Sequence, residues 1–167
     1  MSKMIKPSVA TRSLDNFLVP GMLDSTISDA LSVMKKLCEE MKESRILCLR
    51  VHNRFLFLRF EVENKPIGTR IQSDLILKYG ACVGDFVRFL RKHVHRNILS
   101  RLAANRRILY KIMTTHQELD YFFYKVYLGS RPEMRTWKDK WSSDVQMQLQ
   151  QLAEFLSIRS VVDDELS

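Results

Sequence analysis

The chain has 167 residues and carries 27 Lys and Arg against 19 Asp and Glu, a net charge of +8. This length fits one domain with a sizeable core, and 46% hydrophobic residues with only five Gly and four Pro favour a globular, helix-rich protein. There is no run of about 18 apolar residues and no apolar stretch near the start, so we expect neither a constitutive transmembrane helix nor a secretory signal.

The three cysteines, Cys38, Cys48 and Cys82, lie in apolar-periodic segments without metal-ligand or CxxC spacing. We therefore expect buried thiols in a protein of the reducing cytosol.

Residues 1–22 are mixed in polarity and predict a flexible leader. After Pro20 and Gly21, either Asp24 or Ser25 can cap a first amphipathic helix. Its apolar residues recur at helical spacing from Ile27 to Met41, so one face of this helix is expected to be buried.

The segment 45–63, RILCLRVHNRFLFLRFEVE, fits two structures. Partial alternation after His52-Asn53 allows a hairpin, whereas the 3-4-3-4 spacing from Cys48 to Val62 predicts a helix. We favour the helix because no other segment offers strands with which to form a sheet.

A break at 66–68 precedes a third helix, which Thr69 can cap and which extends to about Leu90. Gly80 and Gly84 lie inside this helix at a cost of roughly 1 kcal/mol each relative to Ala. They predict either the close approach of a neighbouring helix or a local kink.

Positive charge is concentrated between Asp85 and Glu118, where the chain has no acidic residue. The eight cations of this stretch are Arg88, Arg91, Lys92, Arg96, Arg101, Arg106, Arg107 and Lys111. Removing these eight leaves 19 charges of each sign, so the excess is local. Such a local excess indicates a docking surface for an anionic partner, either phosphate-rich lipid or nucleic acid.

A connection near 93–97 leads into a fourth helix that continues to about Val126 and ends at Gly129. His116 lies on its apolar stripe and is expected to be a hydrogen-bonded core histidine, whereas His93 and His95 are expected to gain charge only at mildly acidic pH. No acidic or cysteine partners accompany these histidines, so we expect no metal site.

A linker precedes a last helix, in which Trp137 and Trp141 lie one turn apart. This pair can pack the helix onto the rest of the fold or anchor it at a membrane interface, and we favour packing. The acidic tail, 161–167, is expected to fray.

These elements predict an all-α protein, a four-helix bundle at 23–129 with an additional C-terminal helix at 130–160. The chain has no nucleotide-binding, metalloprotease, hydrolase or kinase signature, so we expect no enzyme, no catalytic residue and no cofactor.

Two segments carry a family resemblance. One is CEEMKESRILCLRVHNRF at 38–55, and the other is Gly84 with Phe89 followed by NILSRLAANRRILYKIMTTHQELDYFFYKVYL at 97–128. Both resemble the N-terminal four-helix (HeLo-like) bundle of the mixed lineage kinase domain-like proteins, the executioners of necroptosis. The likeness covers roughly residues 25–128 and favours the helix at 45–63.

This resemblance implies a cytoplasmic domain that is recruited to the plasma membrane, binds anionic phospholipid such as phosphoinositide, self-associates as a homo-oligomer and permeabilises the membrane in regulated cell death. Surface cations attract such lipids at about 1 kcal/mol each. The candidate lipid-binding residues are Lys35, Lys36, Arg50, Arg54, Arg88, Arg91, Lys92, Arg96, Arg101, Arg106 and Arg107.

Two alternatives remain open. The tryptophan helix occupies the place of the family's brace region but looks more like the helix before the kinase domain in some protist kinases of the tyrosine-kinase-like group. It thus allows a non-lytic regulatory or oligomerisation module with a kinase or pseudokinase domain downstream. Nucleic-acid binding is less favoured, because residues 91–109 contain no aromatic side chain on which bases would stack.

Overall fold

The structure, a computed structural model, describes residues 22–64, 73–126 and 128–166. Within these ranges every regular element is a helix. In chain order the elements are α2 (Met22–Glu39), the 3-10 turn η1 (Lys42–Ser44), α3 (Arg45–Glu63), α4 (Ser73–His93), α5 (Ile98–Ala103), α6 (Asn105–Lys125) and α7 (Pro132–Leu166). The predictions for the leader, for the Thr69 cap and for the break at 66–68 lie outside the described residues.

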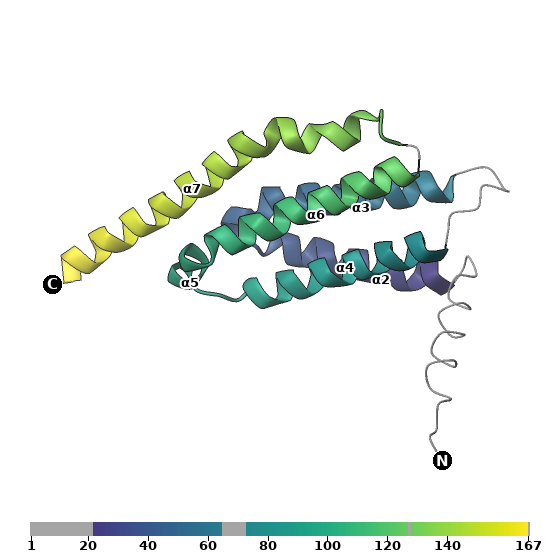
Figure 1. Cartoon of the computed structure of the whole chain (residues 1–167). Coiled ribbons are helices and arrows are strands. Elements are labelled where there is room, and N and C mark those ends of the chain that lie inside the picture. Colours follow the sequence, from purple (N-terminus) through teal and green to yellow (C-terminus); the bar gives the residue numbers. More distant parts are fainter. Residues whose placement is uncertain (1–21, 65–72, 127, 167) are drawn as a thin grey trace, which may run out of the picture.

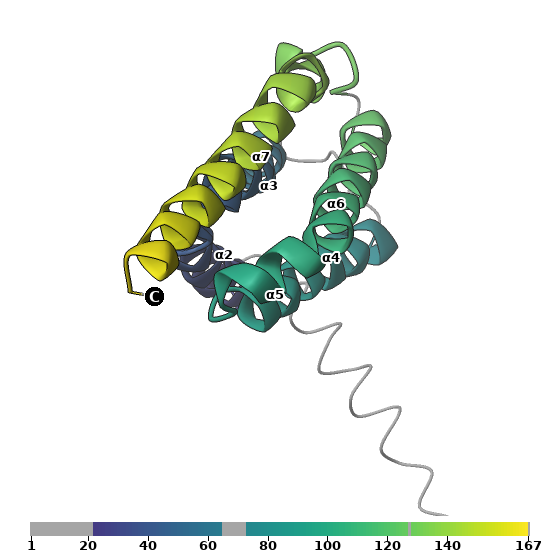
Figure 2. The ribbon, with the colours of Figure 1, turned by 90° about the vertical axis from the view of Figure 1, so that its left-hand side faces the viewer.

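Four of the helices, α2, α3, α4 and α6, run alongside one another (Figure 1). The turn η1, the end of α4, α5 and the start of α6 meet at one end of this group. Figure 2 shows α7 on the outside, where it contacts α3 and α6. The all-helical prediction is confirmed for the described residues.

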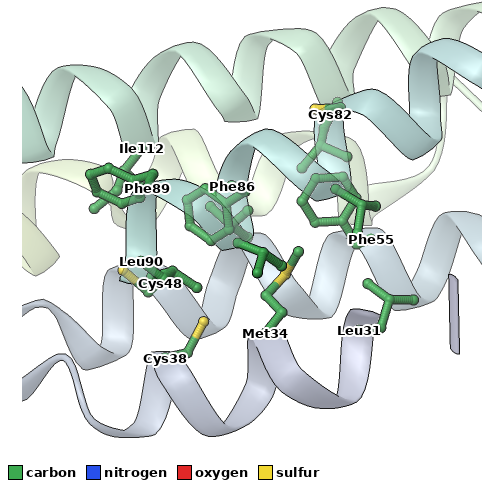
Figure 3. Close-up of a cluster of buried hydrophobic side chains, with 14 of the residues drawn as sticks. Leu31, Met34, Cys38, Cys48, Phe55, Cys82, Phe86, Phe89, Leu90 and Ile112 are labelled. Carbon is green, nitrogen blue, oxygen red and sulfur yellow. The ribbon is translucent and has the colours of Figure 1, made fainter. Parts of the chain in front are cut away.

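The core lies between α2, α3, α4 and α6. Figure 3 shows Met34, Phe55 and Phe86 pointing toward one another from three of these helices. Burying such side chains stabilises the fold by about 1.5–3 kcal/mol each. Cys38, Cys48 and Cys82 are buried free thiols, as expected.

Helix α2 buries the predicted face, and the chain then turns sharply into α3. Lys42 in this turn has a φ of 55°, a left-handed conformation that non-glycine residues rarely adopt. The turn places Glu43 inside the protein, with 6% of its surface exposed. Glu43 is therefore held toward the core although it lies in a connection.

The ambiguous segment 45–63 is the helix α3, so the helix prediction is confirmed and the hairpin is wrong. Cys48, Val51, Phe55 and Leu58 are buried on the predicted stripe. Tyr79 on α4 donates a hydrogen bond to the carbonyl oxygen of Phe55 at 2.8 Å, which joins the two helices.

The predicted close approach at the two glycines of α4 is wrong. A Cβ added at Gly80 would meet no described atom within 4 Å, and one at Gly84 would meet only the Arg88 side chain, at 3.7 Å. The space beside Gly80 is therefore open to a larger side chain.

The predicted fourth helix is divided at Ala104 into α5 and α6. The connection before α5 lies where it was expected, and Asn97 caps α5 by accepting a hydrogen bond from the backbone N–H of Ser100 at 2.9 Å. The division sets α5 apart as a short element at the end of the helix group.

Helix α7 starts at Pro132 and continues through Leu166. The segment 161–166, expected to fray, is thus the last part of α7. Trp137 is buried, as expected for a tryptophan that packs this helix onto the others. None of the helices in the described residues is both long enough and apolar enough to cross a bilayer.

We predict that Gly80→Ala stabilises the protein by about 1 kcal/mol, because alanine has the higher helix propensity and its methyl group enters open space. The neighbouring exposed residue supplies the matched control, since Ala81→Gly should lose about the same amount. Urea denaturation of the three proteins measures both changes. A destabilised Gly80→Ala variant would contradict the open environment of this position.

Candidate functional site

Of the eleven predicted lipid-binding residues, six lie exposed or half-exposed between α4 and α6, three are held in ion pairs between distant parts of the fold, and two are exposed on α2. The first group, on α4, on the connection that follows it and at the start of α6, is here called the basic end. Its members are Arg88, Arg91, Lys92, Arg96, Arg106 and Arg107.

Most cations of the basic end form no ion pair within the described residues. Arg88 pairs with Asp85 one turn away, and its side chain remains 71% exposed. Arg91, Lys92, Arg106 and Arg107 form no ion pair with any carboxylate in the described ranges. Their charge is therefore available to an external anion.

His93 shows that cations far apart in the sequence converge here. This histidine is buried against Phe89, with the two ring centroids 5.0 Å apart. Its pKa is lowered mainly by burial and further by Arg96, Lys92 and Arg107. Lys92 and Arg107 thus both lie near this imidazole, in agreement with the direct contact between α4 and α6. The expectation that His93 gains charge in mild acid needs correction, since burial opposes its protonation.

Arg101 does not belong to the exposed surface. Its Nε donates a hydrogen bond to the Glu43 carboxylate at 2.7 Å, and its Nη1 donates to the carbonyl oxygen of Arg96 at 2.6 Å. Both members of the ion pair are almost fully buried, at 5% and 2% side-chain exposure. The pair anchors α5 to the turn between α2 and α3, so Arg101 positions the basic end and cannot contact a membrane from this structure.

Arg54 is also buried, in a cluster of Arg54, His116, Asp120 and Trp137 that we call the α7 clamp. Its guanidinium pairs with Asp120 and donates to His116 Nδ1 and to the His116 carbonyl oxygen, each at 3.0 Å. It also donates to the carbonyl oxygen of Glu133 at 3.3 Å. One arginine thus links α3, α6 and α7, and it lies away from any surface that lipid could reach.

Trp137 completes the α7 clamp. Its ring stacks on His116 with centroids 4.4 Å apart, and its indole N–H donates to Asp120 at 3.1 Å. The pKa of His116 falls to about 3, first because it is buried and second because Arg54 and Arg50 lie nearby. A neutral imidazole can accept the hydrogen bond from Arg54 at Nδ1. His116 is thus a buried, hydrogen-bonded histidine, as the sequence predicted.

The remaining candidates are separate from the basic end. Arg50 donates to both oxygens of Asp144 on α7, at 2.5 and 3.2 Å, and so joins α3 to α7. Lys35 and Lys36 are exposed on α2, beside exposed Glu39 and Glu40. They belong to a mixed-charge surface that attracts anions less than the basic end does.

Sequence reasoning missed the carboxylate partners of these arginines, the buried Glu43 and Asp144 and the half-buried Asp120. Each lies 58 or more residues from its arginine, so local charge patterns could not reveal the pairs. The burial of Arg54 could have been predicted from the sequence. Arg54 lies three residues after Val51 and four before Leu58, on the apolar face of α3.

The described residues contain no group of three or more His, Cys, Asp or Glu that could hold a metal ion. Comparison with known proteins finds no matching family model, no matching curated protein and no matching solved structure.

We predict that Arg101→Met lowers the free energy of unfolding by about 3 kcal/mol, because it leaves the Glu43 carboxylate buried without its counter-charge. Arg88→Met removes the exposed pair with Asp85 and should cost less than about 0.5 kcal/mol. Chemical denaturation compares the two variants. Equal losses would contradict the structural role of the buried pair.

We also predict that His116 contributes to acid destabilisation. Its folded-state pKa, about 3, lies below the ordinary value of 6.5, so the unfolded chain binds more protons between these values and stability falls as pH is lowered through this window. His116→Gln keeps a hydrogen-bond acceptor for Arg54 and removes the group that titrates. The unfolding free energy of this variant should therefore fall less steeply than that of the wild type between pH 6.5 and pH 4, and the two slopes should differ by up to about 1.4 kcal/mol per pH unit. Denaturation at several pH values measures the slopes, and identical slopes would contradict the neutral state of His116.

Proposed function

We propose that this chain is a membrane-targeting, self-associating helical-bundle domain that docks on anionic phospholipid and permeabilises membranes. In this proposal α2, α3, α4 and α6 form a four-helix bundle and α7 braces it. The shared core of these four helices and the outer position of α7 support the assignment.

The basic end is the observation that carries the proposal. It gathers exposed cations from two helices, and no acidic residue occurs from 86 to 117. Each cation near an anionic leaflet contributes about 1 kcal/mol, so four to six of them suffice for reversible docking. The attraction falls within a Debye length, which makes the docking sensitive to salt.

Lipid is favoured over nucleic acid because the charges lack a stacking platform. Residues 91–109 contain no Phe, Trp or Tyr, and the next aromatic residue along the chain is Tyr110. Single-stranded nucleic-acid sites usually combine cations with several aromatic rings. A charged surface with the single exposed ring of Tyr110 beside it lacks the several rings of such sites and fits head groups, which need only cations.

The test compares two double charge reversals in the full chain. Arg91→Glu/Lys92→Glu alters the basic end, whereas Arg135→Glu/Lys140→Glu makes the same change in net charge at exposed positions on the first half of α7, away from α5 in Figure 1. Binding is measured by co-sedimentation with phosphatidylcholine vesicles that contain phosphatidylserine and a phosphoinositide. We expect the first variant to bind roughly 30-fold more weakly or worse, from about 1 kcal/mol per lost cation, and the second to retain most of the affinity.

Release of an encapsulated dye from the same vesicles tests permeabilisation. Leakage that requires anionic lipid and is lost in Arg91→Glu/Lys92→Glu is the expected result. Binding without leakage would favour the non-lytic regulatory module. Equal binding to neutral vesicles, or none to anionic ones, would overturn the proposal.

A further inference from the structure

The short helix α5 exposes two leucines beside the basic end. Leu99 is 53% exposed and Leu102 is 39% exposed, although α5 buries Arg101 on its other side and Ala104, which follows the helix, is also buried. Leu99 and Leu102 are three residues apart and therefore share the outer face of the helix. We call these two residues the apolar tip.

The fold itself holds the apolar tip outward. The Asn97 cap fixes the start of α5, and the buried ion pair of Arg101 with Glu43 fixes the side of α5 that faces inward. Because the anchoring arginine occupies the inner face, Leu99 and Leu102 cannot turn into the core without breaking that pair.

The surroundings of the apolar tip indicate which partner covers it. Arg96 precedes α5, and Arg106 and Arg107 follow it, with no carboxylate from residue 86 to residue 117. Tyr110, 70% exposed, follows Arg106 by four residues on the outer side of α6. Apolar side chains next to cations and an exposed tyrosine are the composition of a surface that enters the boundary between head groups and acyl chains.

We infer that Leu99 and Leu102 insert into the outer acyl region of an anionic bilayer while the basic end binds the head groups. This inference rests on the proposed docking function and adds the element that enters the membrane. Leu56 and Phe60 on α3, 41% and 62% exposed, provide a comparison, because they lie outside the acid-free stretch and Glu61 and Glu63 follow them in the sequence.

The experiment measures the affinity of the full chain for phosphatidylserine-containing vesicles. Leu99→Ala/Leu102→Ala should bind about tenfold more weakly, because much of the leucine area that would enter the acyl region is removed. Its dependence on salt should match that of the wild type, since no charge changes. The matched control, Leu56→Ala/Phe60→Ala, should bind within about twofold of the wild type. Circular dichroism melting confirms that both variants fold.

A second measurement places the apolar tip directly. An environment-sensitive dye on Leu99→Cys should shift to the blue and be quenched by brominated acyl chains when anionic vesicles are added. The unmutated chain controls for labelling, because Cys38, Cys48 and Cys82 are buried.

The outcomes separate the two proposals. If the wild type does not bind anionic vesicles, docking itself fails and insertion fails with it. If the wild type binds through the basic end, but Leu99→Ala/Leu102→Ala binds equally well and the dye is not quenched, insertion is overturned while docking stands. Loss of self-association with unchanged vesicle binding would likewise overturn insertion, because it would assign the apolar tip to a protein partner.

Discussion

The buried ion pair between Arg101 and Glu43 fixes the connection between α4 and α6 against the turn between α2 and α3. Two charges removed from water are costly unless they stay together, so this contact allows one arrangement of α5 relative to the core. The direct contact between α4 and α6 places the end of α4 next to the start of α6, and the ion pair holds α5 beside them. The exposed cations of the basic end and the outward leucines of α5 both depend on this arrangement.

The protein uses its arginines in two ways. Arg50, Arg54 and Arg101 have carboxylate partners on distant parts of the chain and hold helices together. The arginines of the basic end have exposed or half-exposed side chains, and the one ion pair among them in the described residues is the exposed pair of Arg88 with Asp85. The buried pairs thus hold the fold together, and the cations left exposed are the ones to which we assign docking.

Periodicity predicted the helices well where a single apolar stripe faces the core, as from Ile27 to Cys38 in α2, although Met41, the last expected member of that stripe, lies buried in the turn after the helix. It also favoured the helix at α3, which has large apolar residues on more than one side. The sequence could not show the break at Ala104, because the apolar spacing continues from α5 into α6. Nor could it show that Arg101 is buried, since its partner Glu43 lies 58 residues away. Exposure depends on such distant pairs, which is why three of the predicted lipid contacts lie in ion pairs within the fold.

The proposal that the basic end of this helical protein faces the membrane can be tested by hydrogen–deuterium exchange of the full chain, with and without phosphatidylserine-containing vesicles. We expect added protection to be concentrated in peptides from 88–111, with little change in α3 and in the first half of α7. Protection that is centred on α3 or spread evenly over all helices would contradict it.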